Sequence, residues 1–122
     1  MLFDKKIIEL KSLIYKTLSP YLSSKCAFLE LPYYPNVGDL LIWEGTEKFI
    51  EDHGMECVYK ASRWSYKYRR LDKNITILLQ GGGNFGDIWR PCQDFRLKVI
   101  RDYMDNPIII LPQSVFYEDE KV

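Results

Sequence analysis

The chain has 122 residues, of which 47% are hydrophobic, 15% aromatic and 28% charged. A chain of this length forms about one domain, and its apolar content excludes an intrinsically disordered protein. Lys plus Arg number 17 and Asp plus Glu number 17, so the formal net charge is +0. No overall charge draws the chain to nucleic acid or to an anionic lipid surface, and we predict no nucleic-acid partner.

The cysteine content and the N-terminal residues bear on metal binding and on the compartment. The three cysteines are far apart and form no CxxC pair or Cys/His cluster, so we predict no metal site. The first residues lack the apolar core of a signal peptide, and no stretch approaches the roughly 20 apolar residues that a membrane span needs. We therefore expect a reduced, cytoplasmic protein without a membrane span.

The first part of the chain predicts a helix, a strand and a second helix. Apolar residues at steps of three and four predict an amphipathic helix over residues 3–18. Residues 26–32 form a short apolar run that is typical of a buried strand. Residues 39–53 carry a helical stripe, and Gly54 supplies a left-handed end for that helix.

The rest of the chain repeats this alternation. Residues 56–61 and 75–80 predict the second and third strands, and the polar and aromatic segment between them includes a short predicted helix at residues 66–71. Helical spacing returns at residues 92–104, and residues 108–111 predict a fourth strand.

Alternating helices and near-continuous apolar strands predict the α/β class. We expect a single Rossmann-like lobe over residues 1–122, with a parallel sheet of about four strands and helices on both faces. The expected strand order is second, first, third, fourth. In such a sheet, ligands bind beyond the carboxyl ends of the strands, where neighbouring connections leave to opposite faces.

Three predicted loops leave strands at that edge: residues 33–39, 81–87 and 112–114. With the expected order, the first two face each other across one crevice. The second loop has the pattern G-x-G-x-x-G between a strand and a helix. Its glycines either bring backbone N–H groups close to an anion or relieve crowding in a tight turn.

Acidic residues end two of these loops. Asp39 and Asp87 each precede a predicted helix, so each is either an N-cap or a carboxylate that binds or deprotonates a sugar hydroxyl. His53, the one histidine, lies at a predicted helix end, where we expect it to cap carbonyl groups rather than catalyse.

Residues 63–70 interleave cations with aromatic rings. Such a segment either stacks on sugar or base faces while pairing with phosphate, or forms a solvated loop whose Trp64 and Tyr68 pack back on the sheet.

Three motifs in order carry a family resemblance. Asn36-Val-Gly-Asp39 with Leu-Leu-Ile-Trp-Glu-Gly45, then Ile77-Leu-Leu-Gln-Gly-Gly-Gly-Asn-Phe-Gly-Asp87, then Leu111-Pro-Gln-Ser114 resemble the polysaccharide pyruvyl transferase family. The resemblance implies an enzyme that moves a pyruvyl group from phosphoenolpyruvate to two hydroxyls of a saccharide, forming a cyclic ketal and releasing phosphate. Its members look like two facing Rossmann-type lobes, similar to the GT-B architecture.

The resemblance also implies roles for residues. Asp39 is the first choice for a catalytic carboxylate and Asp87 the second. The implied substrate-binding residues are Asn36, Gly38, Gly81, Gly82, Gly83, Asn84, Arg90, Gln113 and Ser114. The implied substrates are phosphoenolpyruvate and a saccharide acceptor, free or lipid-linked, with no further cofactor, and the implied setting is exopolysaccharide or capsule synthesis.

The length of the chain departs from the family pattern. Family members are more than twice as long, and the resemblance places the groups that hold phosphoenolpyruvate in a C-terminal lobe that this sequence does not contain. We therefore expect an N-terminal lobe that is inactive alone. Two alternatives are a dinucleotide-binding Rossmann protein, although no acidic residue follows the fourth strand before Glu118, and a non-catalytic half that assembles with a partner chain or with itself.

Overall fold

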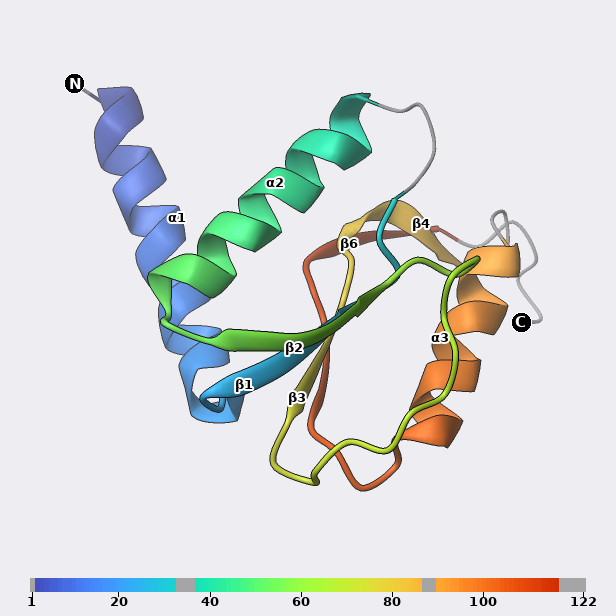
Figure 1. The fold of residues 1–122 in the computed structure, drawn as a ribbon. Coiled ribbons are helices and arrows are strands. Elements are labelled where there is room, and N and C mark those ends of the chain that lie inside the picture. The colour runs from blue at the N-terminus through green and yellow to red at the C-terminus, as the bar shows by residue number, and fades with distance from the viewer. Residues whose placement is uncertain (1, 33–36, 87–89, 117–122) are drawn as a thin grey trace.

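The computed structural model describes residues 2–32, 37–86 and 90–116. The three long helices and the four strands of the main sheet follow one another as the sequence predicts (Figure 1). In chain order they are α1 (Leu2–Leu18), a 3-10 turn (Ser19–Tyr21), β1 (Lys25–Leu29), α2 (Val37–Asp52), β2 (Glu56–Ala61), β3 (Thr76–Leu79), β4 (Gly82–Gly86), α3 (Arg90–Asp102), β5 (Ile108–Ile110) and β6 (Gln113–Phe116).

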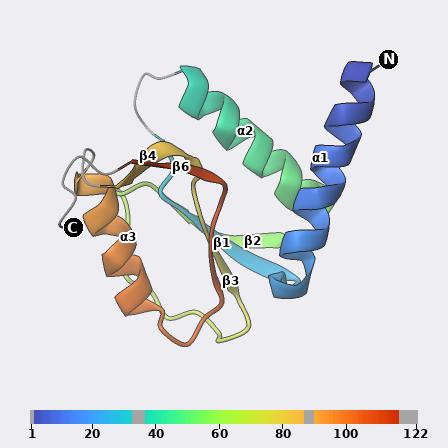
Figure 2. The same ribbon diagram turned by 180° about the vertical axis from the view of Figure 1, so that it is seen from behind.

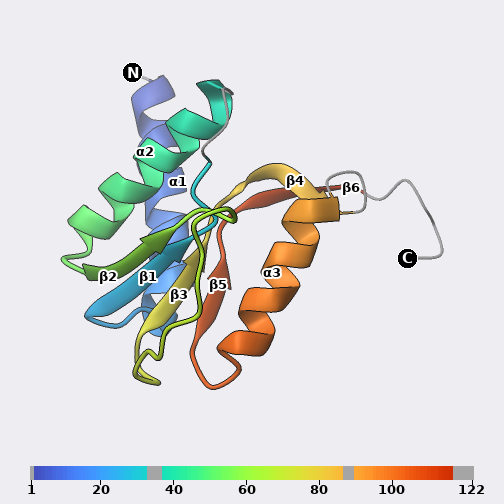
Figure 3. The same cartoon turned by 45° about the vertical axis from the view of Figure 1, so that its right-hand side comes forward.

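The main sheet has four parallel strands in the order β2-β1-β3-β5, which confirms the predicted class and order. The sheet lies between α2 on one face and α3 on the other (Figures 1 and 3). The connections of β1 and β3 thus leave in opposite directions. The point where a doubly wound sheet offers a ligand site lies between these two strands.

Strand residues alternate between two hydrophobic clusters because successive side chains point to opposite faces. On the face covered by α3, Leu29 and Leu79 pack with Phe95 and Val99. On the face covered by α2, Phe28 and Leu78 pack with Ile50 and its neighbours. All four residues of β3 are buried, as expected for a parallel strand covered on both faces.

The alternation reverses at the end of β1. Leu29 belongs to the cluster under α3, and Leu31, two residues later, belongs to the cluster under α2. Glu30 between them has a left-handed backbone with φ of 69°. Such a backbone costs an L-residue roughly 1–2 kcal/mol. It turns the Glu30 side chain to the α3 face, where a regular strand would have placed it under α2.

The glycine-rich segment differs from its prediction. Residues 82–86, expected within a loop, form β4, which pairs in parallel with β6 in a second, two-stranded sheet. Gly81 explains the close approach of these segments, since a Cβ there would lie 2.5 Å from the carbonyl oxygen of Pro112. The pairing of β4 with β6 depends on contacts between distant segments, which local pattern does not report.

The prediction of a short helix at residues 66–71 is wrong. Residues 63–65 form a turn and residues 66–72 have irregular structure. Ser62 organises this turn: its Oγ accepts hydrogen bonds from the backbone N–H groups of Trp64 and Ser65, at 3.2 and 3.1 Å. A serine that bonds to nearby backbone in this way favours a turn over a helix.

The N-terminal helix is confirmed, but none of its residues is buried. Leu18 at its end packs against the cluster under α2. The other large apolar side chains of α1 remain exposed, and Phe3 has 72% of its surface accessible. Seen from behind, α1 lies on the α2 side of the sheet (Figure 2).

Candidate active site at the carboxyl edge of the sheet

The start of α2 and the end of β3 meet at the carboxyl edge. Gln80 follows β3, is 2% exposed, and donates from Nε2 to the backbone oxygen of Asp39 at 3.3 Å. Asp39 is the third residue of α2, so it lies within the first turn and is not the N-cap. Partial burial raises the pKa of its carboxyl. The predicted approach of Asp39 to the glycine segment is therefore present in the structure.

The second and third predicted loops also meet. Gly82, Gly83 and Asn84 lie in β4, while Gln113 and Ser114 begin β6. Gly82 is the register partner of Gln113. Extended backbone at β4 differs from the tight turn into a helix that a dinucleotide-binding loop uses.

The other predicted residues are placed as follows. Gly38 is the second residue of α2, beside Asp39. Arg90 is the first residue of α3 and forms an exposed ion pair with Asp94 at 3.5 Å on the same helix. Asn36 and Asp87 lie outside the described residues. The roles assigned to all these residues stay predictions.

Sequence reasoning missed a buried ion pair at this edge. Glu30 Oε1 accepts a hydrogen bond from Arg96 Nε at 2.9 Å, and the two side chains are only 6% and 1% exposed. Arg96 lies on α3, which reaches the carboxyl end of β1 from the opposite face to α2. Burial raises the pKa of Glu30 to about 7, because desolvation outweighs the attraction of the Arg96 and Arg63 charges.

A second guanidinium lies close to this pair. Arg63 follows β2, and its Nη1 donates to Sγ of Cys92 at 3.3 Å. Its guanidinium carbon also lies 4.3 Å from the centre of the Trp64 ring. Burial raises the pKa of the Cys92 thiol, and the charges of Glu30 and Asp39 raise it further.

These side chains form what we call the carboxyl-edge cluster: Glu30, Asp39, Arg63, Cys92 and Arg96. The cluster combines two carboxyl groups whose pKa values are raised with two guanidinium groups. The pKa of about 7 lets Glu30 exchange protons near neutral pH, and guanidinium groups bind carboxylate or phosphate. The only sequence signal for the Glu30–Arg96 pair was the single acidic residue in the apolar run Phe28-Leu-Glu-Leu31.

Comparison with known proteins identifies the family. The polysaccharide pyruvyl transferase profile matches residues 36–122. The chain is 41% identical over 101 residues to EpsO of Bacillus subtilis (strain 168), described as a putative pyruvyl transferase, with 80% of this chain and 30% of that protein covered. It is 32% identical over 107 residues to pyruvyl transferase 1 of Schizosaccharomyces pombe (strain 972 / ATCC 24843), covering 80% of this chain and 27% of that protein.

The chain belongs to the polysaccharide pyruvyl transferase family. It spans 30% of the length of EpsO and 27% of that of pyruvyl transferase 1. The matched region begins at Asn36 and takes in Asp39, the glycine segment and β6, so the three predicted motifs lie within it.

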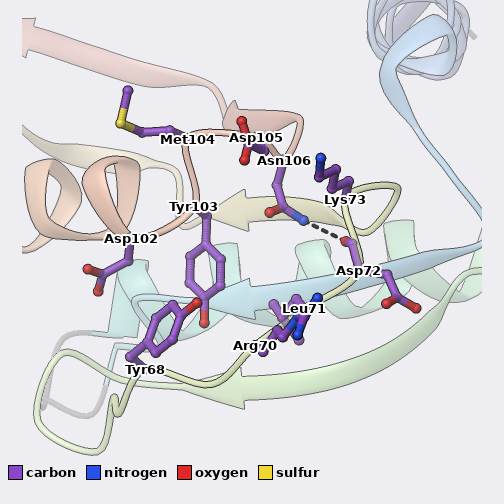
Figure 4. Close-up of a pocket in the computed structure, with 10 residues that line it drawn as sticks. All are labelled: Tyr68, Arg70, Leu71, Asp72, Lys73, Asp102, Tyr103, Met104, Asp105 and Asn106. Carbon is purple, nitrogen blue, oxygen red and sulfur yellow. Dashed lines mark hydrogen bonds between the residues drawn. The ribbon is translucent and has the colours of Figure 1, made fainter.

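A separate cavity of about 280 Å³ lies at the opposite edge of the sheet, before β3 and β5 (Figure 4). Its polar groups hold loops together. Asn106 Nδ2 donates to the backbone oxygens of Asp72 and Ile75 at 2.7 and 3.0 Å, and Tyr103 Oη donates to that of Arg69 at 2.7 Å. We therefore assign this cavity a structural role.

The aromatic and basic segment of this family member is split between the two edges. Trp64 and Tyr68 are 57% and 60% exposed, so neither is buried on the sheet. Tyr68 stacks on Tyr103 with ring centres 5.5 Å apart, at the cavity edge. Arg63 and Trp64 remain at the carboxyl edge with the cluster.

His53 caps α2 as predicted: its Nδ1 lies 2.8 Å from the backbone oxygen of Phe49. The ring also stacks on Tyr15 of α1, with centres 4.4 Å apart. In the described ranges, no group of three or more His, Cys, Asp or Glu side chains is arranged to hold a metal ion. No helix there is long and apolar enough to cross a membrane.

Proposed function

We propose that this chain is the acceptor-side lobe of an enzyme that transfers a pyruvyl group from phosphoenolpyruvate to two hydroxyls of a saccharide. The product is a cyclic ketal, and phosphate is released. The observation that carries the proposal is the contact between Gln80 and the Asp39 backbone, which brings the first turn of α2 to the end of β3. Family membership supplies the reaction class.

The acceptor hydroxyls need a base, because each loses its proton as its oxygen bonds to the central carbon of the donor. We assign this role first to Asp39. Its partly buried carboxyl lies in the first turn of α2, where the helix dipole supports a negative charge, while partial burial raises its pKa. These opposing effects suit a carboxylate that takes up a proton and releases it again.

The donor brings a carboxylate and a phosphate, and both need cations. Arg63 and Arg96 supply positive charge at the carboxyl edge, but Arg96 already pairs with Glu30. We propose that a second lobe supplies the main donor contacts and that this chain alone is inactive. The reaction serves exopolysaccharide or capsule synthesis, in line with the relatives named for pyruvyl transfer, and the three free cysteines fit the reducing cytoplasm.

The test uses a hybrid transferase in which this chain replaces the matching segment of EpsO. The hybrid, intact EpsO and the chain alone are incubated with phosphoenolpyruvate and a panel of oligosaccharides. We expect the hybrid to release phosphate in step with formation of a ketal methyl group detected by proton NMR, and the chain alone to release none. A folded hybrid without ketal formation, beside active EpsO, would contradict the proposed function.

A further inference from the structure

Glu30 lies at a position where both the buried carboxyl group and the backbone conformation are unfavourable. Its side chain is 6% exposed, and its backbone adopts φ of 69°, a conformation that favours glycine. A glycine at this position would remove the backbone strain and the buried charge together. Strained, buried polar residues cluster at functional sites, so the side chain itself requires an explanation.

Arg96 bonds to only one of the two carboxyl oxygens of Glu30. Oε1 accepts the hydrogen bond from Arg96 Nε at 2.9 Å. Oε2 is also buried, and in the ranges that the structure describes it has no hydrogen-bond partner. A buried carboxylate oxygen without a partner is unfavourable, so a group that bonds to it on binding would be favoured.

The location of this oxygen relates it to the acceptor site. Glu30 follows β1 and Gln80 follows β3, and these adjacent strands mark the point where the connections diverge. The charges of Glu30 and Asp39 both act on the Cys92 thiol, so both carboxyl groups lie near the N-terminal turn of α3. Glu30 approaches from the α3 face, and Asp39 belongs to α2 on the other face.

We propose that Glu30 is a proton-transfer residue of the acceptor site, held by Arg96 through one carboxyl oxygen and presenting the other to an acceptor hydroxyl. The inference rests on the proposed pyruvyl transfer. In that reaction two hydroxyl protons leave the saccharide as two C–O bonds form and the C–O bond to phosphate breaks. One proton balances the new methyl group, and the other ends on the released phosphate.

Glu30 and Asp39 lie on opposite sides of the edge, so each carboxyl group can accept the proton of one acceptor hydroxyl. The groups that face Glu30 are Arg96 and Cys92 from α3 and Arg63 from the segment after β2. Burial raises the pKa of Glu30 to about 7, a value at which the group accepts and returns a proton at neutral pH.

The first test measures the ionisation of Glu30 in the chain itself. Carbon-13 NMR follows the side-chain carboxyl groups from pH 4 to pH 9, and the signal missing in Glu30→Gln is assigned to Glu30. We expect a midpoint near neutral. A midpoint at the ordinary value for glutamate would overturn the inference whether or not the proposed function holds.

The second test separates a proton-transfer role from a structural one in the hybrid transferase. Glu30→Gln should lower kcat by about 100-fold or more and remove the ionisation near neutral from its pH profile. Glu30→Met combined with Arg96→Met replaces the ion pair with apolar side chains, a change that is often neutral for stability. We expect this double variant to fold and remain inactive.

Activity near that of the parent in either variant would overturn the inference while leaving the proposed function standing. An inactive parent hybrid beside active EpsO counts against the proposed function, and the carboxyl titration then decides the state of Glu30 by itself. Glu44→Gln, at an exposed position on α2, is the control and should change neither readout.

Discussion

The Gln80 side chain and the Asp39 backbone are joined by a hydrogen bond of 3.3 Å across 41 positions of sequence. Gln80 is buried at the end of β3, and its direction follows from the alternation that puts Leu78 on the same face. The bond fixes the first turn of α2 relative to the glycine segment that begins one residue later. Gln80 thus links two predicted substrate-binding segments directly.

Replacing Gln80 tests this link. Gln80→Met keeps the approximate volume but removes the donor, and should lower the free energy of unfolding by about 1 kcal/mol. In the hybrid transferase it should also raise KM for the acceptor. Urea denaturation and acceptor titration measure the two effects. Gln93→Met on α3 is the matched control, and an equal loss of acceptor affinity there would show that the link has no special role.

Gly81 is required by the approach of two backbones. Gly81→Ala places a Cβ 2.5 Å from the carbonyl oxygen of Pro112, and backbone atoms on both sides resist displacement. We expect a loss of about 1–3 kcal/mol in the free energy of unfolding. Gly45→Ala on α2 is the control, because its Cβ meets nothing within 4 Å and should stabilise the helix by about 0.5–1 kcal/mol. Equal effects of the two substitutions would contradict this account.

The ionisation of Glu30 makes stability depend on pH. Its pKa is about 7 in the folded chain against an ordinary value of 4.5, so between these values the folded chain keeps a proton that the unfolded chain has lost. The free energy of unfolding should therefore fall as pH rises through this interval, by roughly 3 kcal/mol for a shift of this size.

Comparison with Glu30→Gln isolates this contribution. Urea denaturation of both proteins at several values from pH 4.5 to pH 8 gives the difference in their free energies of unfolding, from which other titrating groups cancel. As pH rises, the parent should lose stability relative to Glu30→Gln, which carries no ionisable group at this position. A difference independent of pH would mean that Arg96 holds Glu30 ionised throughout the interval.

Asp39→Asn separates a catalytic carboxylate from a helix-stabilising one. In the hybrid transferase the substitution should abolish ketal formation and leave the thermal midpoint nearly unchanged, because the side chain is partly exposed and asparagine retains its shape. Product NMR and thermal unfolding measure the two properties. A large fall in the midpoint with residual transfer would assign Asp39 a stabilising role in α2.

Local patterns were sufficient for most of the framework. Apolar runs such as Thr76–Leu79 and the alternation at Glu56–Ala61 are signals within a few residues, so these strands were predicted closely. Strand order followed because parallel strands with right-handed crossovers allow few arrangements. The motif that contains Asp39 was also a local signal, because it lies between the first strand and the helix that it opens.

Contacts between distant segments decided the rest. Gly82 pairs with Gln113 and Glu30 with Arg96, the latter 66 positions away, and neither pairing leaves a periodic signal in the sequence. The sequence pattern also did not predict the left-handed backbone of Glu30, because a glutamate normally avoids that conformation. The sequence by itself determined the four strands of the main sheet and their order, and it indicated the sheet edge where we propose that substrates bind. Tertiary structure decided which charged side chains meet there, because burial and pairing depend on the packing of α3 against the sheet.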